Sequence, residues 1–212
     1  MTPEQESNAR LIVKSLTTFG VTNQYLQAGI LACVSKESNF IPQNENLNYT
    51  FARIKQLWTH VTDQQALAIA GHPEAMGNFM YGGKYGNSPT EGYKYRGRGF
   101  NQITFKSNYD RFGKEIGKDL INNPDLLNEP QTAADALACF FGTEIVAGFN
   151  AKTFLKFGLT VSEDVKDNKA GVEVAIQING GRGTPFTNPI LQEGYNKAML
   201  VVDDLFKLTI LT

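Results

Sequence analysis

The chain has 212 residues, of which 42% are hydrophobic and 19% are charged, so it is long enough to bury a sizeable core in one globular domain. Its formal net charge of −1 at pH 7 excludes a general electrostatic attraction to nucleic acid or to an anionic membrane. We therefore expect a single domain over 1–212 that is monomeric, with no nucleic-acid partner and no stable membrane association.

Helical signals follow one another along the chain. Thr2, Pro3 and Gln5 indicate an N-cap, a proline at the first helical position and a capping box, and Gly20 closes that helix. A second helix is expected to begin near Asn23. The further helices are expected at 51–59, 63–70, 73–81, 108–116, 130–147, 151–157 and 163–178, followed by a last helix from Asn188 to Leu205.

Strand patterns are almost missing. Sustained alternation of apolar and polar residues is nearly absent, and only 40–50 and 93–105 allow a small β element. The predicted fold class is therefore mainly α. No apolar run approaches the ~20 residues that a bilayer span needs, and the polar N-terminus lacks a secretory signal. We expect a protein that is made in a cytoplasm.

The two cysteines, Cys33 and Cys139, both lie among apolar residues. Buried free thiols are the first interpretation, and a disulfide between them is the alternative. A zinc site is not expected, because only His60 and His72 accompany the cysteines and no ligand spacing is present. The sequence predicts neither a metal nor an organic cofactor.

A carboxylate continues the apolar stripe of the second helix. Leu26, Ile30 and Val34 recur at helical spacing, and the next turn of the stripe brings Glu37. A carboxyl group on the core-facing side of a helix end would be partly desolvated, which disfavours its charged form. A general acid for a glycosidic oxygen needs that property. The alternative is a glutamate that pairs with a basic residue elsewhere.

A second carboxylate, Glu45, follows in a loop rich in asparagine. A solvated loop would leave it charged, so Glu37 and Glu45 would differ in the way that an acid and a base differ. Glutamates at such spacing are common, and the pair by itself does not decide the function.

The segment 93–104 interleaves aromatic and basic residues. Residues 98–105 partly match an RNA-recognition signature, but Gln102 occupies the position of a base-stacking aromatic. Flat aromatic faces and planar amides suit a carbohydrate better, with Tyr95, Gln102 and Asn108 as candidates. Arg98 either contributes to that surface or braces a carboxylate through paired hydrogen bonds.

Three motifs, in this order, resemble glycoside hydrolase family 19, the chitinase-like group that includes many bacteriophage endolysins. The first is KESNF at 36–40 with ENLNY at 45–49. The second runs through 81–109, from YGGK through YKYRGRG to QIT and NY. The third is INGG at 178–181. The chain departs from the family pattern at Lys36, where a histidine is usual, and at Gln192, where an arginine is expected and Arg182 is the candidate replacement.

The resemblance implies a lysozyme-like helical catalytic domain with a central cleft and no cofactor. Glu37 matches the general acid, Glu45 the base, and Thr104 a hydroxyl that holds the attacking water. An inverting mechanism requires the two carboxyl groups to lie roughly 6.5–9.5 Å apart. With the carbohydrate interpretation, the expected substrate-binding residues are Tyr49, Tyr95, Arg98, Gln102, Asn108 and Asn179.

The implied function is hydrolysis of the β-1,4 bonds between N-acetylmuramic acid and N-acetylglucosamine in peptidoglycan. A phage endolysin held in the host cytoplasm until lysis would fit a chain without a signal peptide. The alternatives are a chitinase, a lytic transglycosylase and a non-catalytic carbohydrate-binding virion protein. Glu45 and Thr104 argue against the transglycosylase, which needs one acidic residue and no water.

Overall fold

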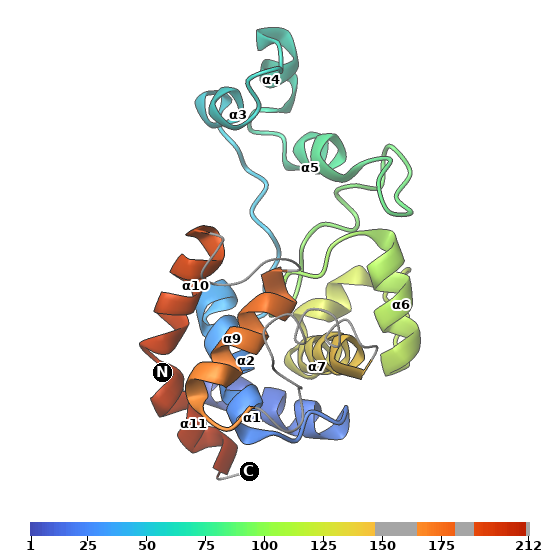
Figure 1. Ribbon diagram of the computed structural model, residues 1–212. Coiled ribbons are helices and arrows are strands. Elements are labelled where there is room, and N and C mark those ends of the chain that lie inside the picture. Colours follow the sequence, from blue (N-terminus) through green and yellow to red (C-terminus); the bar gives the residue numbers. More distant parts are fainter. Residues whose placement is uncertain (147–164, 181–188, 211–212) are drawn as a thin grey trace. The chain divides into compact units, whose positions relative to one another are not determined.

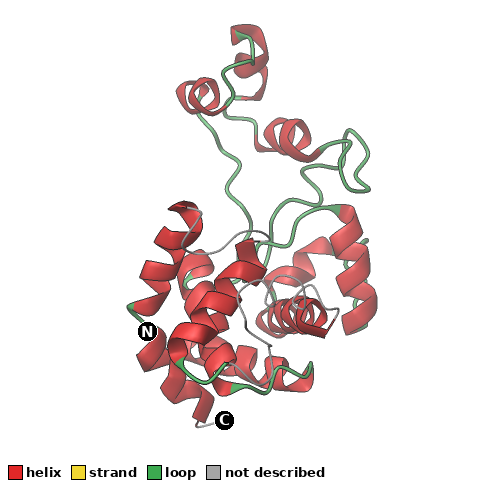
Figure 2. Cartoon of the chain, viewed as in Figure 1, coloured by secondary structure: helices red, strands yellow, loops and turns green. Residues whose placement is uncertain are grey.

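A computed structural model describes residues 1–146, 165–180 and 189–210, without the side chains of 143–146. These parts are helices joined by loops (Figure 2), so the prediction of a mainly α fold is confirmed. Among the described residues, β pairing is limited to one isolated bridge between Arg98 and Ile103. The β element expected at 40–50 is wrong, because backbone groups there, such as the Glu45 N–H, bond to other loops. The helix expected at 151–157 lies outside the described residues.

The chain divides into two compact units. Unit 1 comprises residues 1–42, 99–101 and 129–212, and unit 2 comprises 43–98 and 102–128. The helices of unit 1 (Figure 1) are α1 (Pro3–Thr18), α2 (Gln24–Ser38), α7 (Pro130–Val146), α9 (Asn168–Gly180), α10 (Pro189–Met199) and α11 (Val202–Ile210). Those of unit 2 are α3 (Phe51–Leu57), α4 (Asp63–Ile69), α5 (Pro73–Tyr81), α6 (Lys106–Ile116) and the 3₁₀ helix η1 (Pro124–Asn128).

Local side-chain chemistry sets the helix starts. The Thr2 hydroxyl accepts from the Gln5 N–H at 3.2 Å while the Gln5 side chain accepts from the Thr2 N–H at 2.7 Å, which is a complete capping box. The Asn23 side chain caps α2 by accepting from the Leu26 N–H at 3.0 Å. Both predicted starts are confirmed. No helix in the described part of the chain combines the length and apolarity needed to cross a membrane.

The predicted last helix is two helices, so that expectation is wrong. α10 ends at Met199 and α11 begins at Val202. Between them, Leu200 and Val201 donate to carbonyl groups three residues back, at 3.3 and 3.2 Å, which tightens and ends the turn. Asp203 lies in the first turn of α11, where the helix dipole favours negative charge.

Two glycines bring α2 and α9 into backbone contact inside unit 1. A Cβ atom on Gly29 would lie 2.2 Å from the carbonyl oxygen of Gly171, and one on Gly171 would lie 2.0 Å from the carbonyl oxygen of Tyr25. Glu37 follows Gly29 by eight residues, and Asn179 follows Gly171 by eight. Because each helix rises about 12 Å over eight residues, the glycine contact sets Glu37 and Asn179 at the same level.

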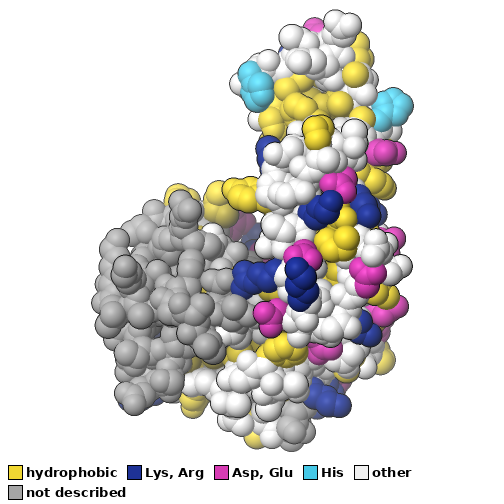
Figure 3. All heavy atoms as spheres, turned by 90° about the vertical axis from the view of Figure 1, so that its right-hand side faces the viewer, with side chains coloured by type: hydrophobic (Ala, Val, Ile, Leu, Met, Phe, Trp, Pro, Cys, Tyr) yellow, Lys and Arg dark blue, Asp and Glu magenta, His cyan; other side chains and the backbone are white. Residues whose placement is uncertain are grey.

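Unit 2 has a small core of its own beneath α3, α4 and α5. Its buried members are Leu47, Ile54, Val61, Ala66 and Met76. Trp58 borders this core and meets the rings of Tyr49 and Phe79 edge-on, with centroids 5.8 and 5.7 Å away. Figure 3 shows the hydrophobic side chains gathered between the two histidines, whereas acidic and basic side chains are interspersed over the rest of the coloured surface.

Candidate active site

Glu37 lies at the exposed end of α2 in unit 1. The buried line of the helix continues through Ile30 and Val34 to Ser38, which is 5% exposed, and Glu37 stands beside that line with an exposed side chain. The expectation of a core-facing carboxylate is therefore wrong, because the last turn rotates Ser38 rather than Glu37 inward. The Glu37 carboxylate pairs with Lys36. For Glu37 to donate a proton, this ion pair must open.

A cavity of about 210 Å³ adjoins Glu37. It is formed by α2, α9 and the start of α10, and its lining residues are Lys36, Glu37, Ile176, Asn179, Gly180, Ile190, Leu191 and Gly194. The Asn179 amide donates to the Glu37 carboxylate at 3.5 Å. The structure therefore brings together two residues that the sequence placed 142 positions apart. Arg182, the proposed replacement for a family arginine, lies outside the described residues, and Gln192 bonds to Asn196 at 2.9 Å.

Glu45 lies in unit 2 and is held by hydrogen bonds with the Tyr81 hydroxyl and with the backbone of Gly97. Its carboxylate accepts from the Tyr81 hydroxyl, whose oxygen lies 2.7 Å from Oε1 and 2.9 Å from Oε2. The Gly97 N–H also donates to Oε2, at 3.3 Å. The Glu45 N–H donates in turn to the Gly97 carbonyl oxygen at 2.8 Å. Glu45 is therefore half-buried and fixed at both its backbone and its carboxylate, unlike the solvated loop residue that the sequence predicted.

Sequence reasoning missed Tyr81. This residue ends α5, and the only signal was its position at the start of the YGGK part of the second motif. Burial, followed by the hydrogen bond to Glu45, raises the pKa of the Tyr81 hydroxyl. The phenol therefore stays protonated and acts as a donor to Glu45.

Thr104, Gln102 and Asn108 form a chain of hydrogen bonds in unit 2. The Thr104 hydroxyl donates to the Gln102 carbonyl at 2.9 Å, and the Asn108 amide donates to the Thr104 carbonyl at 2.9 Å. The Gln102 side chain donates to the Gln43 carbonyl at 3.1 Å. Because the Thr104 hydroxyl proton is already used, its oxygen remains as an acceptor for a water molecule.

Tyr95 and Arg98 are structural rather than substrate-binding, which corrects the sequence prediction. Tyr95 is fully buried, and its hydroxyl donates to the Ile121 carbonyl at 3.2 Å. Arg98 is 2% exposed and donates to Asp125 Oδ1 at 2.8 Å and to the Tyr109 hydroxyl at 2.9 Å. The bracing alternative holds for Arg98, but its carboxylate is Asp125 rather than a candidate catalytic glutamate. Tyr49, also predicted to bind substrate, is half-buried against Trp58.

Cys33 and Cys139 are buried thiols that are not joined in a disulfide, which confirms the first interpretation. Burial raises the pKa of the Cys33 thiol to about 12. In the described ranges, no three residues among His, Cys, Asp and Glu gather as a metal site would require.

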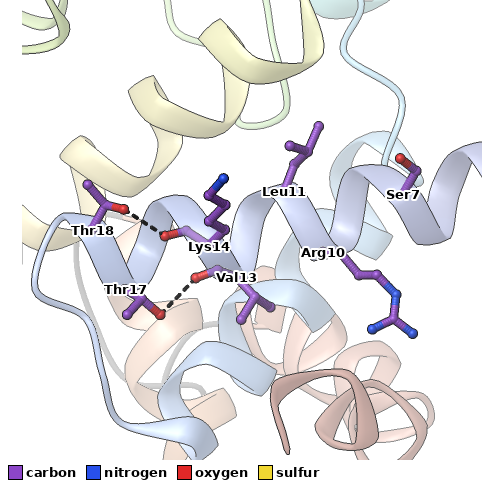
Figure 4. Close-up of a pocket in the computed structure, with 7 residues that line it drawn as sticks. All are labelled: Ser7, Arg10, Leu11, Val13, Lys14, Thr17 and Thr18. Atoms are coloured by element: carbon purple, nitrogen blue, oxygen red, sulfur yellow. Dashed lines mark hydrogen bonds between the residues drawn. The ribbon is translucent and has the colours of Figure 1, made fainter. Parts of the chain in front are cut away.

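A larger hollow of about 470 Å³ lies on one face of α1 (Figure 4). It contains none of the predicted site residues. Its Thr17 and Thr18 hydroxyls are turned back to carbonyl groups of α1 itself, at 3.0 Å each. This hollow therefore adds nothing to the candidate site.

Comparison with known proteins places a family match over the second motif. Residues 73–169 match the model of glycoside hydrolase family 19, described as chitinase class I. This range contains Tyr81, Gly97 and Thr104, whereas Glu37 and Glu45 precede it. The residues that hold Glu45 therefore lie inside the match, and the two carboxylates lie outside it.

Relatives point the same way. A glycosyl hydrolase family 19 domain-containing protein of Haemophilus influenzae is 36% identical over 107 residues, which are 48% of this chain and 54% of the relative. Chitinase 3 of Oryza sativa subsp. japonica is 42% identical over 67 residues, 26% of this chain and 21% of that protein. The basic endochitinase of Vitis vinifera is 51% identical over 49 residues, 23% and 14% of the two chains. The chain thus spans about half of the first relative and a smaller share of the plant proteins.

Proposed function

We propose that the chain is a chitinase-like glycoside hydrolase acting on a β-1,4-linked polymer of N-acetylated aminosugars, because residues 73–169 match the family 19 model and a family 19 domain-containing protein is 36% identical over 107 residues. The observation that carries the proposal is the pair of donors, the Tyr81 hydroxyl and the Gly97 N–H, that bond to the Glu45 carboxylate. Hydrogen bonds donated to a carboxylate stabilise its charged form, which is the form that a general base needs. The Tyr81 hydroxyl and the Gly97 N–H supply these bonds from within the family match.

The proposed reaction is a direct displacement. Glu37 gives its proton to the leaving glycosidic oxygen, and the bond from that oxygen to the anomeric carbon breaks. A water molecule held by Thr104 attacks the opposite face of the carbon and loses its proton to Glu45, so the configuration inverts. The cavity beside Glu37 and the Asn179 amide support a sugar next to the acid. The separation of roughly 6.5–9.5 Å between the carboxyl groups stays a prediction.

For the substrate we propose peptidoglycan, as in the endolysin branch that the three motifs resemble. Chitin is the second candidate, favoured by the names of the plant relatives, which are chitinases and endochitinases. The two candidates share the mechanism and differ in composition. Peptidoglycan strands alternate N-acetylmuramic acid with N-acetylglucosamine, whereas chitin contains N-acetylglucosamine alone.

Replacing Glu37 by Gln tests the catalytic proposal. The variant keeps the shape of the side chain but holds no acidic proton, so we expect turnover of purified cell walls to fall by at least about 100-fold while binding in a sedimentation assay persists. Glu115→Gln, an exposed change on α6, is the matched control and should behave as wild type. Near-normal lysis by Glu37→Gln would show that the assignment of the acid is wrong. A non-catalytic binding protein would show no turnover in any variant.

Product analysis decides the bond and the stereochemistry. Mass spectrometry of digested peptidoglycan should show a new reducing end on N-acetylmuramic acid. A reducing end on N-acetylglucosamine would indicate a glucosaminidase, and an anhydro end a transglycosylase. Cleavage of chitin oligomers alone would favour the chitinase. Proton NMR at early times should show the inverted anomer, and a retained anomer would contradict the roles given to Glu45 and Thr104.

A further inference from the structure

We propose that Tyr81 is the positioning residue of the base, and that its hydroxyl holds the Glu45 carboxylate in the orientation that receives the proton of water. This inference rests on the proposed function, in which Glu45 is the base. The Tyr81 oxygen lies within hydrogen-bond distance of both carboxylate oxygens, at 2.7 and 2.9 Å. The single phenolic proton therefore fixes the rotation of the carboxylate as well as its place.

The opposite side of Glu45 is closed by Gly97. A Cβ atom at position 97 would lie 3.3 Å from the Glu45 Cβ and 2.8 Å from the Gln102 side-chain oxygen. Only a glycine lets the backbone N–H approach the carboxylate without displacing these neighbours. An ionised carboxylate has about four lone-pair sites, and Tyr81 and Gly97 occupy two of them. A carboxylate with these two donors retains acceptor capacity for a water molecule.

Tyr81 is itself held at both ends. Its carbonyl oxygen accepts from the Asn87 side chain at 2.8 Å, and its ring meets Phe105 edge-on, with centroids 5.5 Å apart. These contacts restrict the backbone and the ring of Tyr81, and its hydroxyl donates to Glu45. The other titratable group that acts electrostatically on Tyr81 is the Tyr49 phenol. Burial and the carboxylate keep the Tyr81 proton in place, so Tyr81 stabilises the base and does not itself transfer a proton.

Removing the hydroxyl has a defined consequence. In Tyr81→Phe the ring and its contact with Phe105 remain, but Glu45 loses the donor that favours its charged form. We expect kcat to fall about 10- to 100-fold, with KM changed by less than about twofold because Tyr81 does not touch substrate in this proposal. The acidic limb of the pH–rate profile should move to higher pH, because the charged form of the base loses a hydrogen-bond donor.

Tyr85→Phe is the matched control. Tyr85 is 71% exposed, and its ring packs on the same Phe105, with centroids 4.7 Å apart. The Tyr85→Phe variant makes the same chemical change next to the same neighbour, and among the described residues no carboxylate accepts from the Tyr85 hydroxyl. We expect its kcat and pH profile to equal those of wild type. If the kcat values of Tyr81→Phe and Tyr85→Phe agree within twofold and the acidic limbs of their pH–rate profiles coincide, the positioning role is wrong.

A measurement without turnover separates this inference from the proposed function. In protein labelled with ¹³C at the glutamate carboxyl groups, the Glu45 signal is identified by its loss in Glu45→Gln. Its titration should move to higher pH in Tyr81→Phe and stay unchanged in Tyr85→Phe. An unchanged titration in Tyr81→Phe overturns the inference. Full activity of Glu37→Gln would instead overturn the proposed function and leave the Tyr81–Glu45 result standing.

If Tyr81→Phe does not fold, the reverse measurement decides. In Glu45→Gln the Tyr81 phenol loses a neighbouring negative charge and an acceptor that both raise its pKa. Ultraviolet titration of the tyrosines should then show one phenol ionising at lower pH than in wild type. Superimposable titration curves would overturn the coupling between Tyr81 and Glu45.

Discussion

Replacing Gly29 by Ala should destabilise the protein, although the same change in most helices is stabilising. The new Cβ atom would lie 2.2 Å from the Gly171 carbonyl oxygen, and real Cβ atoms essentially never approach closer than 3.0 Å. The backbones of α2 and α9 must therefore separate by about 0.8 Å, because neither partner is a movable side chain. Overpacking of this kind costs about 1–3 kcal/mol, and more when backbone must shift. Against this cost, alanine in a helix interior is more stabilising than glycine by up to about 1 kcal/mol.

We expect a net loss of about 2 kcal/mol, which for a chain of this size lowers Tm by roughly 4–8 °C. Thermal unfolding followed by circular dichroism measures this loss. The separation should also break the contact between Asn179 and Glu37, because both lie two turns beyond the glycine contact. Turnover at a temperature where both proteins are folded should therefore fall as well.

Gly194→Ala is the matched control, for which we expect a change in Tm of the opposite sign. Gly194 lies inside α10, and its new Cβ atom would meet the Lys36 Cε at 3.4 Å and the Ile176 Cδ1 at 3.6 Å, which are ordinary contacts with side chains. Tm should rise by roughly 1–4 °C, because an interior helical alanine is favoured over glycine. If Gly29→Ala melts at the wild-type temperature, or if both variants fall together, the reasoning from backbone contact is refuted.

Arg98→Lys should lower stability by about 1.5–3 kcal/mol, because an ammonium cannot reproduce the fork that joins Asp125, the Lys94 carbonyl and the Tyr109 hydroxyl. An unchanged denaturant midpoint would contradict this bracing role. The Cys33 thiol should resist thiol reagents at pH 8 until the protein unfolds, since burial holds its pKa about three units above the value of 9.0 expected when exposed. The folded state binds this proton more tightly, so the stability that it contributes is complete below pH 9 and is lost as the pH rises towards 12. A Cys33→Ala variant should show a shallower loss over that range, and an equal slope would count against the assignment.

Helix starts follow from neighbouring residues, which is why the sequence predicted them. A capping box joins atoms only three residues apart, so Thr2 and Gln5 specify it wherever the chain lies in space. The same holds for Asn23 at the start of α2. The break between α10 and α11 was missed, because the apolar spacing continues across it and only the local turn at Leu200 and Val201 interrupts the backbone hydrogen bonds.

For the site residues too, the sequence predicted which residues to consider but not their surroundings. Helical spacing, loop composition and motif resemblance identified Glu37 and Glu45 as candidates, yet the spacing and the composition misjudged the surroundings of both. Whether a side chain at the end of α2 faces the core depends on a rotation of one residue, and Ser38 takes the inward position. The Tyr81 contact with Glu45 joins positions 36 residues apart, and local sequence spacing cannot predict such a pair.

The sequence by itself determined the helical class, the helix starts and the motifs that resemble glycoside hydrolase family 19, because each depends on residues within a few positions of one another. Tertiary structure alone decided the partners of each carboxylate and the burial of Tyr95 and Arg98. Exposure and hydrogen bonding are set by what packs on a residue from distant parts of the chain, and composition and periodicity carry no record of that.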